Sequence, residues 1–292
     1  MPIGSGRPNG AGAVTWTTAL VDLSSWRKIG VSGADALAWL DSLVTADLSG
    51  LTPGRARQAL LLSPTGRIRA EFTVAVRPGS VLLLQDPIQE DPIDRLLTPY
   101  MLSSDVALTD RTAELALFAL PGATSPPDVT GTTPSEPSCL GSGFDLTAAA
   151  PDRDHAMRSL AEAFEPMSNA EWERWRIVRG MPRFGVDGDV DDLPQEAGLE
   201  AAVSFGKGCF LGQEAVAKVR NLGHPRRRLL HLRTEGVTAA GEPLVADGKE
   251  VGHVTSAAAS GHGTVLLASV RWAALEPQLR TVSGDRLLPA GT

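Results

Sequence analysis

The stretch KGCFLGQE, residues 207–214, decides how the rest of the chain is interpreted. Its cysteine, Cys209, is one of two in 292 residues, and glycines stand on both sides of it. The residues that follow, AVAKV, are good helix formers, so the cysteine lies just before a predicted helix N-terminus. Exposed backbone N–H groups and the helix dipole favour an anion there, and Lys207 adds a positive charge. We therefore predict an accessible thiolate at Cys209, with a cysteine buried in a glycine-rich turn as the alternative.

Composition limits the classes of function. The chain is 42% hydrophobic, enough for a substantial core, and its length suggests two or three structural units. A formal net charge of −7 disfavours general binding to nucleic acid or to a membrane surface. The basic cluster at residues 226–228 is interpreted as a strand edge or a domain junction. No apolar run approaches the roughly 18 residues that a membrane helix needs. Residues 1–13 are Gly/Pro-rich and are expected to form a disordered leader, not a signal peptide.

Cysteine and carboxylate spacing predicts no metal site. Cys139 and Cys209 form no CxxC pair, and a disulfide between them has no support in the sequence. Residues 187–192 are rich in aspartate, but their spacing does not match a calcium-binding loop. We expect a solvated acidic loop there. Together these features indicate a soluble protein of a reducing cytoplasm.

Hydrophobic periodicity predicts an α+β fold followed by a strand-rich region. A strand–turn–strand–strand pattern between residues 59 and 84 indicates an antiparallel meander. Residues 122–143, with Cys139, are interpreted as a surface loop. After residue 223, short strands alternate with glycine turns, which favours a small closed barrel. We therefore divide the chain into an α+β region at 14–222, itself two subdomains, and a barrel domain at 223–292. Strands are expected at 28–31, 59–62, 68–76, 81–84 and 114–120, and helices at 35–44, 91–102, 152–164 and 168–180.

The cysteine stretch resembles the K-G-C-[FY]-x-G-Q-E signature of the YgfZ family, folate-binding relatives of the glycine-cleavage T-protein, at every fixed position. Residues 29–36, 44–47 and 176–182 resemble further segments of that family. The resemblance implies two interleaved α+β subdomains plus a C-terminal small β-barrel, arranged around a central hole that holds a folate. Tetrahydrofolate or another reduced folate is the implied cofactor.

The resemblance also implies functional residues. Cys209 is the implied functional thiol, with Lys207 beside it. Two tryptophans are associated with folate in the family, and the flat face of an indole suits stacking on a pterin. The alternative for each tryptophan is ordinary core packing. The implied folate-contacting residues are Trp26, Trp172, Arg176 and Gln213.

Two departures from the T-protein pattern argue against aminomethyl transfer. An acidic pair follows the hairpin glycine in T-proteins, and Arg69 and Ala70 occupy those places here. A glutamate that contacts the pterin is replaced by Val178, a loss expected to cost about 1–3 kcal/mol. Glu71 and Glu196 are the alternative carboxylates for these roles.

The sequence therefore predicts a folate-binding accessory protein for the assembly or repair of iron–sulfur cluster proteins, acting through Cys209. Iron–sulfur proteins or their assembly factors are the expected partners. One cysteine cannot hold a four-cysteine cluster alone, so a cluster role has to be shared with a partner. The alternatives are a folate-dependent methyl or aminomethyl transferase and a scaffold that has lost folate binding.

Overall fold

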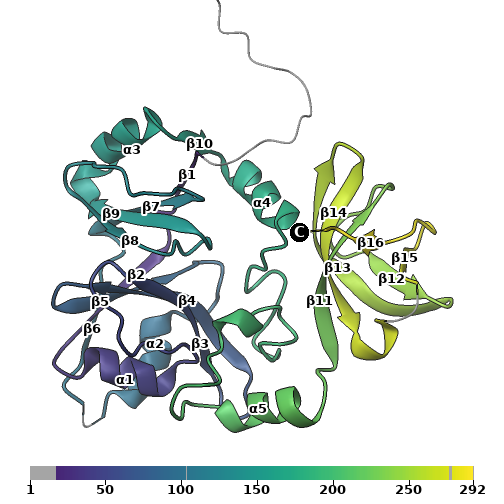
Figure 1. Cartoon of the computed structure of the whole chain (residues 1–292), viewed down its shortest axis with the longest axis horizontal. Helices are drawn as coiled ribbons and strands as arrows, with labels where there is room; N and C mark the ends of the chain where they lie inside the picture. The colour runs from purple at the N-terminus through teal and green to yellow at the C-terminus, as the bar shows by residue number, and fades with distance from the viewer. Residues whose placement is uncertain (1–17, 103, 276–277, 292) are drawn as a thin grey trace, which may run out of the picture.

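The computed structural model describes residues 18–291, with gaps at 103 and 276–277. The predicted leader at residues 1–13 lies outside the described residues. Figure 1 shows two α+β subdomains on one side of the molecule and a strand-rich C-terminal sheet on the other. Helix α4 and the segment that follows it run between the two sides.

The two N-terminal sheets are interleaved along the chain. Strand β1 starts the first sheet, the chain then leaves to build the second sheet, and it returns with β7. The first sheet has the order β10-β1-β7-β9-β8 and the second the order β3-β4-β5-β2-β6. Their strands are β1 (Ala19–Asp22), β2 (Arg27–Ser32), β3 (Ala56–Leu62), β4 (Ile68–Arg77), β5 (Ser80–Gln85), β6 (Ala107–Asp110), β7 (Leu115–Pro121), β8 (Thr132–Ser135), β9 (Gly143–Ala149) and β10 (Glu165–Met167). The predicted meander is β3-β4-β5, and the interleaved α+β architecture is confirmed.

Among the described residues, five α-helices cover or connect these sheets. Helix α1 and helix α2 pack on the second sheet, and α3 packs on the first. Helix α4, expected at 168–180, begins with a capping box, in which Ser168 and Glu171 satisfy each other's backbone N–H groups. The helices are α1 (Ala36–Leu43), α2 (Ile93–Leu97), α3 (Arg153–Ala161), α4 (Asn169–Val178) and α5 (Gln213–Leu222), with 3₁₀ turns at Thr98–Tyr100, Ala150–Asp152, Glu200–Ala202 and Trp272–Ala274.

One predicted helix matches within a residue at each end, and another is shorter than expected. Ser32 ends strand β2, and Asp35 stands at the N-cap of α1 without capping it through its side chain. The Asp35 carboxylate accepts the backbone N–H of Asp105 instead. The helix expected at 91–102 is shorter, because Pro99 lies in the 3₁₀ turn that follows α2.

The C-terminal region forms one curled antiparallel sheet, a half-barrel in place of the closed barrel expected from the sequence. Its order is β15-β12-β13-β14-β11-β16, so two-residue strands stand at both edges. Register shifts after Leu244 and after Val254 bend the strands around their apolar core. The strands are β11 (Arg227–Thr234), β12 (Pro243–Ala246), β13 (Lys249–Ser260), β14 (Gly263–Arg271), β15 (Arg280–Thr281) and β16 (Leu288–Pro289).

Two segments interpreted as solvated loops are partly internal. Residues 122–143 contain strand β8 and the buried Leu140, and Cys139 is half-buried. Asp187, expected in a solvated acidic loop, is fully buried against Arg176. Within the described residues, no helix combines the length and apolar character needed to cross a membrane.

Candidate functional site

A cavity of about 290 Å³ opens between the two N-terminal subdomains and the segment that follows α4. Strand β4 and the residues after β5 form one wall, and residues 137–141 and α4 form another. Trp26 and Trp172, the two tryptophans singled out in the sequence, both line it. This volume is at the lower end of the about 300–1,000 Å³ typical of small-molecule pockets. The cavity therefore suits a compact ring system with any tail extending outward.

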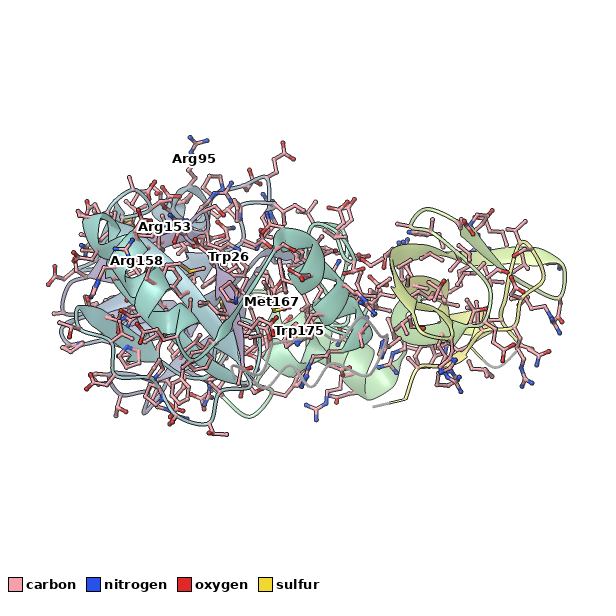
Figure 2. All side chains as sticks on the ribbon, turned by 90° about the horizontal axis from the view of Figure 1, so that it is seen from above. Trp26, Arg95, Arg153, Arg158, Met167 and Trp175 are labelled. Atoms are coloured by element: carbon pink, nitrogen blue, oxygen red, sulfur yellow. The ribbon has the colours of Figure 1, made fainter. Side chains whose placement is uncertain are left out.

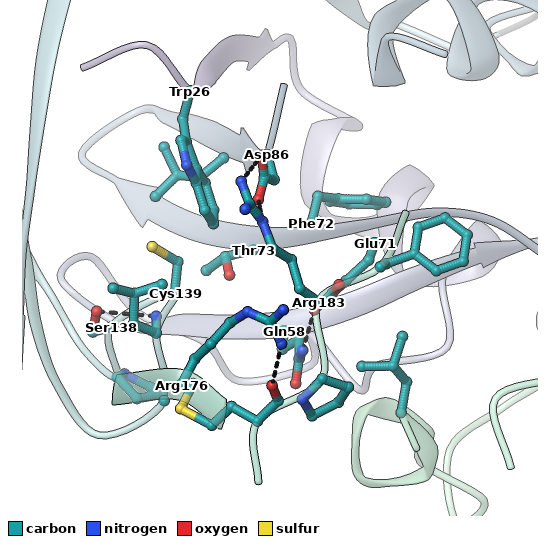
Figure 3. A pocket seen from close by; sticks show the side chains of 18 of the residues that line it. Trp26, Gln58, Glu71, Phe72, Thr73, Asp86, Ser138, Cys139, Arg176 and Arg183 are labelled. Carbon is teal, nitrogen blue, oxygen red and sulfur yellow. Dashed lines mark hydrogen bonds and ion pairs between the residues drawn. The ribbon is translucent and has the colours of Figure 1, made fainter. Parts of the chain in front are cut away.

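The two tryptophans differ in how accessible their rings are to a ligand. Trp26 is partly exposed, and Figure 3 shows its ring beside Cys139 and Asp86. Trp172 is only 7% exposed and belongs to an apolar cluster with Trp175. Figure 2 shows Trp26 and Trp175 inside the molecule, whereas Arg95 extends away from it. Trp26 is therefore the better stacking surface, and Trp172 mainly forms the wall.

Glu71 brings a carboxylate into the cavity. Alternation along β4 puts Arg69 and Glu71 on one face and buries Ala70 in the core on the other, as the strand period requires. Gln58 donates its side-chain N–H to Glu71 Oε1. Burial raises the pKa of Glu71 to about 7. The cavity thus holds a carboxyl group with a pKa near neutral pH, supplied by one of the two alternative carboxylates named from the sequence.

Arg183 places a positive charge on the same cavity. Its Nε and Nη2 atoms bind the two oxygens of Asp86 at 2.7 and 3.2 Å, a bidentate pair. Its guanidinium carbon lies 5.7 Å from the centroid of the Trp172 ring. One further N–H reaches Glu173 at 3.4 Å, which leaves two of the five guanidinium donors for a ligand.

Arg176, predicted to contact folate, has no donor left for one. Its side chain lies within the cavity wall but is fully buried. All five N–H donors are occupied, by both oxygens of Glu173, the carbonyl of Met181, Asp187 and the hydroxyl of Ser256. Because Ser256 lies on β13, Arg176 ties α4 to the half-barrel. The structure therefore gives Arg176 an architectural role, and Arg183 is the arginine that faces the cavity.

Cys139 contributes a thiol to the cavity that the sequence did not single out. Its Sγ lies 3.5 Å from Oδ1 of the buried Asp145, which also accepts the hydroxyl of Ser138 and the backbone N–H of Cys139. Burial first, and the nearby Asp145 second, raise the pKa of the Cys139 thiol well above its ordinary value. Burial likewise raises the pKa of Asp145 to about 6. Cys139 is thus a protonated, weakly nucleophilic wall residue.

The loop of the predicted functional thiol lies elsewhere. Cys209 is exposed, and it is not among the residues that line the cavity. It precedes α5 as predicted. Gly212 has φ of +79°, and a Cβ there would lie 2.4 Å from the carbonyl oxygen of Ser63, so this position requires glycine. The loop therefore packs closely on the β3–β4 hairpin and presents Cys209 outward.

Lys207 and Gln213 hold the shape of this loop. The Lys207 side chain is 2% exposed, and its ammonium binds the Asp41 carboxylate at 3.0 Å. It also donates to the carbonyls of Asp41, Val44 and Ala46 at the end of α1. Gln213 Oε1 accepts the backbone N–H of Phe210 at 3.3 Å. Both side chains are thus turned toward the protein, and a role for Lys207 in thiol chemistry remains a prediction.

The two remaining carboxylate positions lie away from the cavity. Val178 is 42% exposed and does not line it, so the loss of a glutamate at this place does not remove an acceptor from this cavity. Glu196 is buried and binds Arg67 and the backbone N–H groups of Leu193 and Arg226. Glu71 is therefore the only one of the two alternative carboxylates that lines the cavity.

Sequence reasoning did not identify Gln58, Asp86, Cys139 and Arg183 as cavity residues. They come from four separate segments, and no local motif links them. Within the described residues, no group of three or more His, Cys, Asp or Glu side chains is arranged to hold a metal ion.

Comparisons with known proteins agree with this architecture. Residues 9–136 match the GCVT N-terminal domain family. A putative chloroplastic transferase of Arabidopsis thaliana is 27% identical over 84% of this chain, which spans 63% of that protein. An aminomethyltransferase of Streptomyces avermitilis is 27% identical over 85% of this chain and 76% of its own length. The tRNA-modifying protein YgfZ of Colwellia psychrerythraea is 25% identical over 75% of this chain and 72% of its own.

A solved structure shares this fold. The glycine cleavage system aminomethyltransferase T of Bartonella henselae aligns with a TM-score of 0.80, covering 94% of this chain and 87% of that one at 20% identity. The chain therefore has the aminomethyltransferase T fold, with its interleaved sheets and C-terminal curled sheet.

Proposed function

We propose that this protein binds a reduced folate in the cavity and serves the assembly or repair of iron–sulfur cluster proteins through Cys209. The observation that carries the folate part is the convergence of Trp26, Glu71 and Arg183 on one enclosed space. A pterin offers a flat ring for Trp26 and ring N–H donors for a carboxylate. The glutamate tail of a folate is an anion that the free donors of Arg183 can bind.

The cysteine part of the proposal is supported by the loop that carries it. The loop is built rigidly by Gly212 and Lys207, yet its thiol points outward and is exposed. An exposed cysteine on a fixed loop suits contact with another protein, which has to supply the remaining ligands of any cluster. The resemblance of residues 207–214 to the YgfZ signature, and the similarity to a YgfZ protein, support the same reading.

Cells that lack this protein provide the test. The activities of several iron–sulfur enzymes should fall, and the wild-type chain should restore them. Cys209→Ala should fail to restore them although it accumulates normally, whereas Cys139→Ala should restore most activity. Full rescue by Cys209→Ala would contradict the role of the exposed thiol.

A folate-dependent methyl or aminomethyl transferase is the second candidate, and one observation favours it. Glu71, with its pKa raised to about 7, is suited to move a proton at neutral pH. Arg69 and Ala70 provide no carboxylate, so any such activity has to depend on Glu71. We expect no measurable aminomethyl transfer from the glycine-cleavage intermediate to tetrahydrofolate. Turnover that is lost in Glu71→Gln would establish this second function instead.

A further inference from the structure

A second hollow lies outside the cavity, on the half-barrel where the chain passes from α5 into β11. Its volume is about 460 Å³. Its wall includes three arginines, two histidines and one tryptophan: His224, Arg226, Arg227, His253, Arg271 and Trp272. None of these residues lines the folate cavity. Two residues of the basic cluster at 226–228, interpreted from the sequence as a strand edge or a domain junction, thus line this hollow, namely Arg226 and Arg227.

Two of the arginines face each other across neighbouring strands. Arg227 of β11 is paired directly with Arg271 of β14, so the two side chains leave the sheet on the same face. Directly opposite residues have Cβ atoms about 4.5–5.5 Å apart, and like charges in such a pair destabilise the sheet. Within the described residues, neither guanidinium donates a side-chain hydrogen bond or forms an ion pair within 4.0 Å, and the charge of Arg227 reaches the Asp192 carboxylate only from farther away. Glu250, the one carboxylate of the wall, forms no ion pair with either within 4.0 Å.

The neighbouring Arg228 is a surface cation that does have partners nearby. Arg228 lies 3.7 Å from the carboxylate of Glu200 and 5.8 Å from the centroid of the Trp272 ring. Arg227 and Arg271 form no ion pair within 4.0 Å with a described carboxylate, although Arg227 attracts the more distant Asp192 carboxylate. An arrangement that costs stability and leaves two cations facing each other is typical of a site that binds an anion from solution.

A flat aromatic surface lies beside the arginine pair. The rings of His224 and Trp272 are stacked, with centroids 5.0 Å apart and planes 4° from parallel. The backbone N–H of Trp272 donates to the carbonyl of Arg226 at 2.9 Å, which fixes the stack against the start of β11. His224 is exposed, so its ring can be extended by another planar ring.

We propose that this hollow binds a nucleotide, with a phosphate between Arg227 and Arg271 and the base stacked on His224. A phosphate has more acceptor oxygens and more charge than a carboxylate, and it can satisfy two guanidinium groups at once. The adjoining aromatic stack explains why the ligand carries a planar ring and is not inorganic phosphate alone. The site is independent of folate binding and of Cys209.

The test measures binding of AMP, adenosine and inorganic phosphate to the full chain by calorimetry at low ionic strength. AMP should bind at least about tenfold more tightly than adenosine, because the phosphate contacts two arginines. Arg271→Gln and Arg227→Gln should each lower the affinity for AMP about tenfold. Arg233→Gln is the matched control, since Arg233 lies on the same face of β11 outside the hollow, and it should leave binding unchanged. Equal binding of adenosine and AMP, or no effect of either arginine variant, would overturn the proposal.

Two further readouts separate this site from a general basic surface. His224→Ala should weaken the binding of AMP. Inorganic phosphate should compete with AMP for this variant as strongly as it does for the wild type. Thermal melting should show Arg271→Gln to be as stable as the wild type or more stable, because the variant relieves like-charge repulsion. A lower melting temperature with intact AMP binding would mean that the arginine pair is structural. A short single-stranded RNA that binds more tightly than AMP, and whose binding is lost in Arg271→Gln, would show that the bound nucleotide belongs to an RNA chain. If the RNA binds no more tightly than AMP, the site is for free nucleotides.

Discussion

In the cavity, Arg183 and Glu71 keep donors and acceptors available for a ligand, whereas in the loop before α5 the side chain of Lys207 is used by the protein itself. Arg183 retains two N–H donors beside Trp172, but the ammonium of Lys207 is surrounded by acceptors at the end of α1. The two cysteines follow the same division, since Cys139 lies in the cavity wall and Cys209 is exposed. The difference suggests that ligand recognition and thiol chemistry take place at separate surfaces.

The largest effect is expected where the loop meets α1. Lys207→Met removes the partner of Asp41 and of three carbonyls, so the free energy of unfolding should fall by about 3 kcal/mol or more. Urea denaturation measures this. Lys218→Met, on the exposed face of α5, is the matched control and should change stability by less than about 0.5 kcal/mol. A stable Lys207→Met that only slows alkylation of Cys209 would instead favour a chemical role for the lysine.

The two thiols should differ strongly in reactivity. An exposed cysteine reacts readily, whereas burial and Asp145 keep the Cys139 thiol protonated. We expect iodoacetamide to label Cys209 on the order of 100-fold faster than Cys139, because the thiolate is the nucleophile. Peptide mapping by mass spectrometry gives both rates. A bound folate should further protect Cys139 and leave Cys209 unaffected, and similar rates at both positions would remove the distinction between the two regions.

Glu71 should make stability depend on pH. Its pKa is raised from 4.5 to about 7 in the folded state, so the folded protein binds more protons than the unfolded chain across that interval. The free energy of unfolding should therefore fall as the pH rises from about 4.5 to about 7, by up to about 3 kcal/mol from this residue. Glu71→Gln should flatten the curve over that interval. Denaturant titrations at pH 4.5 and 7.5 on both proteins supply the comparison, and parallel curves would contradict the assignment.

Much of the fold follows from patterns that are local in sequence. The capping box of Ser168 and Glu171, the strand alternation of β4 and the glycine-rich turns each identify an element without help from the rest of the chain. The half-barrel was harder to predict from the sequence, because whether the sheet closes into a barrel depends on its edge strands. These strands are only two residues long, at Arg280–Thr281 and Leu288–Pro289. Such short strands carry no periodicity.

The site was only partly predictable, for a similar reason. Trp26 and Trp172 were singled out by resemblance to a family, and Glu71 was named as one of two alternative carboxylates. Asp86 and Arg183 were missed because their pairing joins segments 97 residues apart, which no local pattern records. The sequence also does not show that Glu173, Asp187 and Ser256 occupy donors of Arg176, whose contact with folate stays a prediction.

The smallest effect concerns the stacking surface. Trp26→Leu retains apolar bulk but removes the flat ring, so the affinity for a reduced folate should fall about three- to tenfold, equivalent to about 1 kcal/mol. The quenching of tryptophan fluorescence by the ligand should decrease with it. Trp172→Ala is less informative, since Trp172 is part of the core cluster and its removal should also destabilise the fold. Unchanged affinity in Trp26→Leu would place the ligand elsewhere.

The separation of the two surfaces is tested most directly by titrating tetrahydrofolate, kept reduced, into the wild-type chain and into Cys209→Ala, with the heat of binding as the measurement. We predict that both proteins bind one folate with the same affinity, because Cys209 does not line the cavity. No heat of binding to the wild type at millimolar ligand would contradict the assignment of the cavity to folate. Loss of binding in a folded Cys209→Ala would contradict the separation of ligand recognition from the exposed thiol.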